Sequence, residues 1–239
     1  MTESKELEFV SNQAIQAAGE AIQEVNDSTF LVSSDGVTEF RPNNNAKIPI
    51  SITTLGGINK AIESHILGRS AVSVNVNSPE DVVIYGKINE FGNREVLAET
   101  KLRFESFDFD HSHKREEMIV ALQALFSKTP DRDILLKFIS NVKDSNESSF
   151  TDDGTTQIAK ASTGPASLAN VKVPNPVILK PFRTFTEVDQ PESAFIFRMN
   201  NIDSFSLHEA DGGFWKQSAI NNIGEHLETI IDGKVPVIY

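Results

Sequence analysis

Residues 95–109 read EVLAETKLRFESFDF and form the longest strand candidate in the chain. Apolar and polar residues alternate along this run, which is typical of a β-strand with one face in a core. Two shorter candidates precede it, AVSVNVN at 71–77 and DVVIYGKI at 81–88. Together the three runs predict an antiparallel meander in which the long strand dominates the sheet.

Helices and further strands are expected around this meander. Five segments carry apolar residues at helical spacing. They are residues 5–25, 54–67, 113–127, 131–144 and 214–231. Strands are predicted at 30–32 and 37–40, in KIPISI at 47–52, where Pro49 indicates a sheet edge, and in VILKPFRTF, AFIFRM and FSLHEA at 177–210. Helices and strands come in blocks rather than in βα alternation, so we expect an α+β fold of mostly antiparallel sheets with flanking helices.

The stretch 145–175 is poor in large apolar residues and rich in Ser, Thr, Asn and Gly. We therefore expect a linker or extended connection at 146–175. It would join an N-terminal α+β region, 1–145, to C-terminal strands and an amphipathic helix, 176–239. One continuous domain is the alternative.

Composition excludes several chemistries. The 239 residues contain no cysteine, so disulfides, thiolate zinc sites, iron–sulfur clusters and cysteine nucleophiles are ruled out. A formal charge of -12 disfavours nucleic-acid binding. No apolar run approaches the roughly 20 residues that span a bilayer, and no signal sequence is evident. These features predict an acidic, cytoplasmic protein that does not bind membranes.

Common catalytic motifs are missing from the sequence. The phosphate-binding patterns GxxxxGK[ST] and GxGxxG are absent, as are GxSxG and HExxH. We therefore assign no catalytic residue and expect no cofactor.

The motif FDFDHSH at 107–113 is a candidate metal site. Its possible ligands are Asp108, Asp110, His111 and His113, because carboxylate and imidazole groups bind transition metals. The apolar positions of the long strand are even-numbered up to Phe104 and odd-numbered afterwards, which predicts a bulge or strand end near 105–106.

After this switch, Asp108 and Asp110 should point away from Phe107 and Phe109. One ion could collect the candidate ligands only if the chain turned sharply at Asp110. We favour a strand end followed by a helix that Asp110 or Ser112 caps.

The C-terminal half supplies the candidate binding residues. Arg183 and Arg198 lie within the aromatic segments PFRTF and FIFR. Glu209, Asp211 and Trp215 belong to HEADGGFWK, where a strand ends and a helix begins. Aromatic residues beside arginines suit stacking on a ligand, but they equally describe an ordinary strand core.

Four short motifs occur in order in this half: PNP at 174–176, PFRTF at 181–185, DQP at 189–191 and EADGG at 209–213. With FESFDFDHSHKREE at 104–117, they resemble the YfdQ-like family of phage and prophage proteins over about residues 100–239. The resemblance implies a phage-encoded protein in the cytoplasm of an infected host cell. It implies no activity and no catalytic residues.

Two functions of different classes are compatible with these observations. We expect a non-enzymatic accessory protein that forms a homo-oligomer and binds a small ligand or a host or phage protein. The alternative is a metal-dependent hydrolase or nucleic-acid processing enzyme of the phage early region that uses the FDFDHSH motif.

Overall fold

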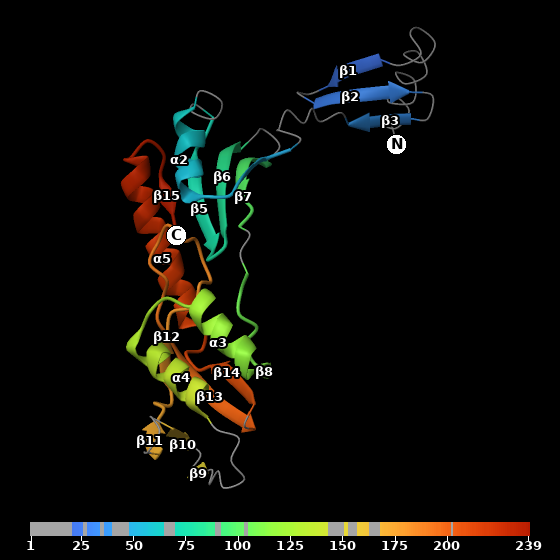
Figure 1. Cartoon of the computed structure of the whole chain (residues 1–239). Helices are drawn as coiled ribbons and strands as arrows, with labels where there is room; N and C mark the ends of the chain where they lie inside the picture. Colours follow the sequence, from blue (N-terminus) through green and yellow to red (C-terminus); the bar gives the residue numbers. More distant parts are fainter. Residues whose placement is uncertain are drawn as a thin grey trace. The chain divides into compact units, whose positions relative to one another are not determined.

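The computed structural model describes residues 21–25, 28–33, 36–39, 48–64, 70–88, 92–102, 105–142, 151–152, 157–162, 168–201 and 203–239. Within these ranges the chain has the predicted α+β fold, with mostly antiparallel sheets and flanking helices (Figure 1). Residue contacts divide the chain into two compact units. They comprise residues 1–47 with 88–93, and residues 48–87 with 94–239. The predicted boundary at 146–175 lies elsewhere, inside the second unit.

The first unit contains a three-stranded antiparallel sheet. Its strands, in spatial order, are β1 (Ala21–Val25), β2 (Ser28–Ser33) and β3 (Gly36–Glu39). The predicted hairpin is confirmed by the β2–β3 register, which pairs Ser33 with Gly36. Gly36 has a φ of 134°, which favours glycine at this turn.

The predicted helix at 5–25 is wrong for its last five residues, which form β1. Pairing with β2, from Ala21 opposite Val32 to Val25 opposite Ser28, outweighs the helical spacing of the apolar residues. Residues 5–20 lie outside the described residues.

The second unit contains a five-stranded mixed sheet with the strand order β15-β5-β6-β7-β4. Its strands are β4 (Ile50–Ile52), β5 (Ser73–Ser78), β6 (Asp81–Ile88), β7 (Arg94–Thr100) and β15 (Val237–Ile238). Strands β5, β6 and β7 are adjacent in the sheet in the order in which they follow one another along the chain, as the predicted meander requires. Both edge strands are parallel to their neighbours, β4 to β7 and β15 to β5. The predicted edge position of KIPISI is confirmed.

The long strand predicted through residue 109 ends earlier, at Thr100. The buried Thr100 hydroxyl accepts a hydrogen bond from Val82 N and donates one to Glu80 O, so it anchors the strand end. Beyond it the chain leaves this sheet and places Phe107 in a different hydrophobic core. The switch of apolar residues from even to odd positions therefore marks the point where the chain passes from one hydrophobic core to the other.

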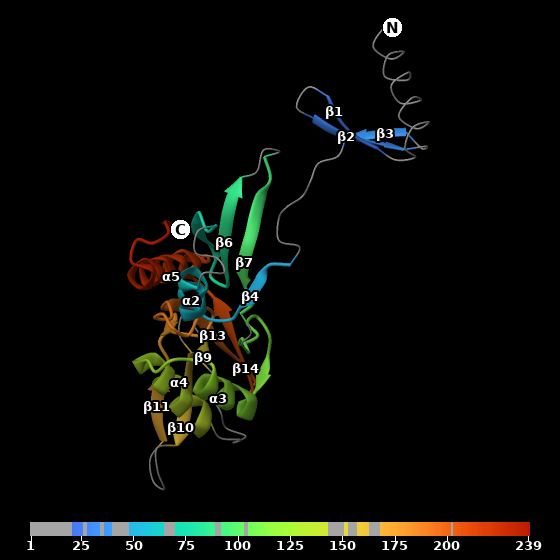
Figure 2. The same cartoon turned by 90° about the horizontal axis from the view of Figure 1, so that it is seen from above.

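Two helices pack on the five-stranded sheet. They are α2 (Leu55–Glu63) and α5 (Phe214–Ile231), which contact each other (Figure 2). Their buried residues Leu55, Ile58, Ile62, Ile223, Leu227 and Ile231 form one core with Val74, Val82 and Ile84. The prediction for α5 is confirmed along its length, whereas α2 ends four residues before the predicted position.

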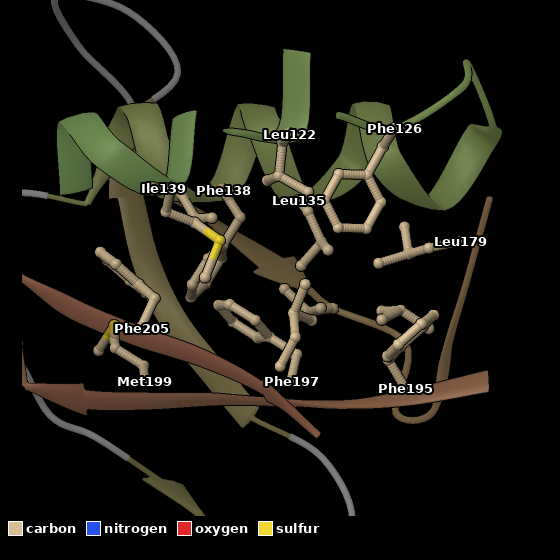
Figure 3. Close-up of a cluster of buried hydrophobic side chains, with 14 of the residues drawn as sticks. Leu122, Phe126, Leu135, Phe138, Ile139, Leu179, Phe195, Phe197, Met199 and Phe205 are labelled. Carbon is tan, nitrogen blue, oxygen red and sulfur yellow. The ribbon is translucent and has the colours of Figure 1, made fainter. Parts of the chain in front are cut away.

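A second sheet, with the antiparallel order β12-β13-β14-β8, carries the other core. Its strands are β8 (His113–Lys114), β12 (Val177–Leu179), β13 (Ser193–Asn201) and β14 (Ser204–Glu209). Helices α3 (Arg115–Ala124) and α4 (Pro130–Asn141) cover one face. Figure 3 shows Leu122, Leu135 and Phe138 from the helices, and Phe126 from the segment between them, facing Phe195, Phe197 and Phe205 from the strands.

The starts of α3 and α4 differ in how well the sequence predicts them. Thr129 caps α4 as its sequence position before Pro130 suggests, and its Oγ1 accepts a hydrogen bond from Arg132 N at 3.1 Å. The predicted α3 caps, Asp110 and Ser112, are wrong. Lys114 is the N-cap, and its N–H donates to the Glu117 carboxylate at 3.1 Å.

The region predicted as a linker contains a third small sheet. Strands β9 (Thr151–Asp152), β10 (Gln157–Ser162) and β11 (Leu168–Lys172) pair antiparallel in the order β11-β10-β9. Among the described residues, no helix has the length and apolar content needed to cross a membrane.

Candidate functional site

The candidate site is built around Arg183, which lies between β12 and β13 and is almost completely buried. Its Nη1 donates a hydrogen bond to Oε1 of Glu209, and its Nη2 donates to Oγ of Ser193. Burial lowers the pKa of Arg183 to about 10, whereas the carboxylates of Glu209 and Asp211 act in the opposite direction. The guanidinium therefore stays charged at neutral pH and is held by a paired carboxylate.

Aromatic rings surround the same guanidinium. Its Cζ lies 3.9 Å from the centre of the Trp215 ring, 5.5 Å from that of Phe195 and 5.8 Å from that of Phe109. A desolvated cation over an indole face is attracted by about 2 kcal/mol. Trp215 is therefore a main contact of Arg183.

The backbone around Arg183 is fixed by a buried glutamine. Oε1 of Gln190 accepts hydrogen bonds from the N–H groups of Arg183 and Thr184, at 3.0 and 3.3 Å. Its Nε2 donates to Phe185 O at 2.9 Å. The Thr184 hydroxyl donates to Pro79 O, near the start of β6. These hydrogen bonds hold the loop that contains Arg183 in place and restrict the conformations of its backbone.

Trp215 is positioned by the N-terminus of α5. The Asp211 carboxylate accepts hydrogen bonds from Gly213 N at 3.0 Å and from Trp215 N at 3.3 Å. Gly213 has a φ of 81°, a conformation that suits glycine. Asp211, predicted as a binding residue, is therefore a structural acceptor at the start of the helix, and it acts on the site through Trp215.

Three of the predicted binding residues line one cavity of about 210 Å³, which we call the Arg183 pocket. Its lining residues are Glu80, Ser106, Phe107, Phe109, Arg183, Glu209 and Trp215. The walls thus carry three aromatic rings, one guanidinium, two carboxylates and a hydroxyl. Because the carboxylates outnumber the guanidinium, the formal charge of the lining is negative.

Two N–H donors on these lining residues are buried without an acceptor from the described residues. They are Nε of Arg183 and Nε1 of Trp215. A buried donor that makes no hydrogen bond costs about 1–3 kcal/mol.

Two of the five predicted binding residues, Asp211 and Arg198, do not line this pocket. Arg198 lies on β13 opposite Ser206, and its place in the alternation puts it on the other sheet face from Phe197. Lys180, a basic residue next to β12, forms ion pairs with Asp189 at 3.3 Å and Glu192 at 3.7 Å. These basic groups do not form one open cationic surface.

The four residues predicted to bind metal do not converge on one point. His111 Nδ1 lies 3.0 Å from Asp108 Oδ1, and His113 Nε2 lies 2.7 Å from the carbonyl oxygen of Asp108. Asp110 instead contacts His208. Among the described residues, no group of three or more His, Cys, Asp or Glu side chains could hold a metal ion.

Two features predicted for the FDFDHSH motif are nevertheless present in the structure. Phe107 is buried while Asp108 and Asp110 are exposed, as the parity argument requires. A sharp turn does occur at Asp110, whose φ is 63°. The turn brings His111 back to the Phe109 carbonyl oxygen, which is the main cause of its raised pKa, with Asp108 as the second cause.

A larger cavity of about 330 Å³ lies beside α5. It is lined by Glu187, Val188, Asp189, Asn222, Glu225, His226 and Thr229. Two of its carboxylates already have structural partners. Glu187 accepts hydrogen bonds from Leu55 N and Gly56 N at the start of α2, and Asp189 pairs with Lys180. The Arg183 pocket, with its aromatic walls, is the better candidate for a ligand.

Sequence reasoning missed Glu80, Ser106, Ser193 and Gln190 as parts of the site. Glu80 lies about a hundred positions before Arg183 in the sequence, in a turn between two strands. No local pattern signals a contact across such a distance.

No family model, curated protein or solved structure matches this chain. The resemblance to the YfdQ-like family therefore stays a prediction.

Proposed function

We propose that this chain binds a small planar cation in the Arg183 pocket. The observation that carries the proposal is the composition of the pocket lining. It contains three aromatic rings, two carboxylates and a single guanidinium. Such walls favour a flat, positively charged molecule, because aromatic rings attract cations and the carboxylate of Glu80 can serve as its counterion. The proposal narrows the predicted small-ligand function to one chemical class.

The cavity volume limits the size of this ligand. Pockets for drug-sized molecules usually measure about 300–1,000 Å³, whereas this one measures about 210 Å³. A single aromatic ring with one short substituent suits this space. Arg183 and Trp215 are already fixed by Glu209 and Asp211, so binding requires little further ordering of these side chains.

Glu80 is the expected counterion of the ligand. Its side chain is exposed at the pocket, and no described residue forms an ion pair with it. The Glu209 carboxylate, by contrast, is already paired with Arg183. A planar amidinium can form two parallel hydrogen bonds to a carboxylate such as that of Glu80.

Fluorescence of Trp215 tests the proposal, because Trp215 is the single tryptophan and lines the pocket. We expect benzamidine to change this fluorescence saturably. Benzoate is the matched control, since it has nearly the same shape and the opposite charge, and it should have no effect. Equal responses to the two compounds, or no response to benzamidine, would contradict the proposal.

Variants then locate the binding site. Glu80→Gln should weaken benzamidine binding by about 1 kcal/mol, or about fivefold in Kd, which is usual for a partly exposed ion pair. Glu116→Gln removes an exposed carboxylate on α3, outside the pocket lining. It should leave the Kd unchanged. Equal weakening by both variants would show that the effect comes from overall charge.

We also propose that the chain forms a homo-oligomer. The support is the exposed edge strand β4, where the side chain of Ile50 is 41 % exposed and that of the preceding Ile48 is 84 % exposed. Apolar residues at an open sheet edge favour pairing with another chain. Light scattering should give a mass above 26.4 kDa, the mass of one chain, and a purely monomeric sample would contradict this proposal.

A further inference from the structure

A second group of side chains lies on the outer face of β14, opposite the core that Phe205 and Leu207 enter. Nε2 of His208 lies 3.0 Å from Oγ of Ser206, and Nδ1 of His208 lies 2.8 Å from Oδ1 of Asp110. A carboxylate, an imidazole and a hydroxyl are thus joined in series through the two nitrogens of one ring. This is the connectivity of a Ser-His-Asp nucleophilic array.

The direction of these hydrogen bonds follows from the charge of Asp110. An ionised carboxylate can only accept, so Nδ1 of His208 carries the proton. In neutral His208, Nε2 then presents its lone pair to Ser206, and the Ser206 hydroxyl donates to it. His208 is therefore in the tautomer that can remove a proton from Ser206.

Asp110 is held in place by its backbone. Its N–H donates to Leu207 O at 3.0 Å, which ties the turn to the same strand that carries Ser206 and His208. Its φ of 63° is a left-handed conformation that Asp and Asn tolerate better than most residues. The turn thus places the Asp110 carboxylate beside His208.

A hydrogen-bond donor stands beside the hydroxyl. Nδ2 of Asn200 lies 3.4 Å from Oγ of Ser206 and 2.7 Å from Oγ of Ser112. An amide N–H at this place can stabilise negative charge that develops on a carbonyl oxygen next to Ser206. Ser206 itself is 3 % exposed, so a substrate must carry a small acyl group and approach past the exposed Asn200 side chain.

We propose that Ser206 is an acyl-accepting nucleophile, that His208 is its general base and that Asp110 is a positioning residue. The substrate class is a small ester. Oγ of Ser206 attacks the carbonyl carbon while its proton passes to His208 Nε2. The ester C–O bond breaks, and the leaving alcohol takes that proton. Water then attacks the acyl-enzyme with the same base, releasing the carboxylic acid and restoring the hydroxyl.

This activity is independent of the Arg183 pocket. Glu209, which lines the pocket, and His208 are neighbours on β14 and therefore point to opposite faces of the sheet. Failure of either proposal leaves the other standing. The competing explanation is structural: the same hydrogen bonds could serve to fix the Asp110 turn against β14.

Covalent labelling distinguishes catalysis from this structural role. We expect a fluorophosphonate to label the unmodified protein on the peptide that contains Ser206, with loss of fluoride, as found by mass spectrometry. Hydrolysis of p-nitrophenyl acetate should fall on the order of 100-fold in Ser206→Ala and His208→Gln. Ser218→Ala, on α5 and outside this group of side chains, is the control and should keep the activity.

Asp110→Asn tests the positioning role. Asparagine accepts the same backbone turn, so the fold should persist in circular dichroism while kcat falls at unchanged KM. Absence of label on Ser206 in the unmodified protein would overturn the proposal. So would a folded Ser206→Ala variant that hydrolyses the ester at the original rate.

Discussion

Cζ of Arg183 lies 3.9 Å from the centre of the Trp215 ring, in the contact that joins the β12–β13 connection to the first turn of α5. Glu209 pairs with the same guanidinium, and Asp211 holds the backbone of Trp215. The side chains that line the Arg183 pocket are thus stabilised by one another. Substitutions at this contact should affect the stability of the protein as well as ligand binding.

Trp215→Ala should lower the free energy of unfolding by about 3–5 kcal/mol, because it removes a buried aromatic side chain and leaves a cavity. Its neighbour Phe214 is 73 % exposed, so Phe214→Ala should change the same quantity by less than about 0.5 kcal/mol. Denaturant unfolding of both variants checks this. Similar losses in the two variants would contradict the described packing.

Glu209→Gln should lower the free energy of unfolding by about 2 kcal/mol, since it leaves the buried Arg183 cation without its counterion. The double variant Arg183→Met/Glu209→Gln removes both charges. It should lose less stability than the sum of the two single variants, because the penalty for an unpaired charge is relieved. A double-mutant cycle measures this difference, and strict additivity would show that the pair is not coupled.

Acid stability should depend on Glu63 at the end of α2. Hydrogen bonds from Lys234 and Lys60 lower its pKa from 4.5 to about 2. Because the folded-state pKa is depressed, this group stabilises the fold fully above pH 4.5, and the contribution disappears as the pH falls towards 2. The pairs are exposed, so added salt should weaken the effect.

Unfolding measured across this pH range checks the prediction. Glu63→Gln should be less stable than the original protein at neutral pH and should approach it in stability near pH 2. Glu116→Gln, on the exposed face of α3, serves as the control. A stability difference between Glu63→Gln and the original protein that does not change with pH would contradict the role of Glu63.

The effect of Gly224→Ala on the free energy of unfolding should change sign when the Tyr239 side chain is removed. Alanine in place of a helical glycine usually stabilises by about 1 kcal/mol, but a Cβ built at Gly224 would overlap the Tyr239 ring. Gly224→Ala alone should therefore destabilise by about 1–2 kcal/mol. In a Tyr239→Ala background the same substitution should become stabilising, and thermal unfolding of the four combinations distinguishes the outcomes.

The elements predicted best are those whose signals are local. Helix α5 follows its apolar spacing along its whole length, and the start of α4 follows from Thr129 and Pro130. The strand at 21–25 was missed because its partner, β2, decides the conformation. The early end of β7 was missed because Phe107 is drawn into the other core, which no strand pattern reveals.

The candidate site was predicted only in part, because the sequence indicates residue types but not which residues meet in the fold. Arg183, Glu209 and Trp215 were recognisable as unusual residues, but their convergence is a tertiary property. Asp110 and His208 are 98 residues apart in the sequence, and their contact depends on the backbone hydrogen bond from Asp110 N to Leu207 O. Residue type indicated candidates, whereas the sheet register decided which of them meet.

The most direct test of the proposed ligand site is the indole N–H signal of Trp215 in a proton–nitrogen correlation spectrum. The chain has one tryptophan, so this signal needs no assignment. Benzamidine should move it along a saturable curve, and benzoate at the same concentrations should not. An indole signal that stays in place while benzamidine is raised to millimolar concentrations would contradict cation binding in the Arg183 pocket.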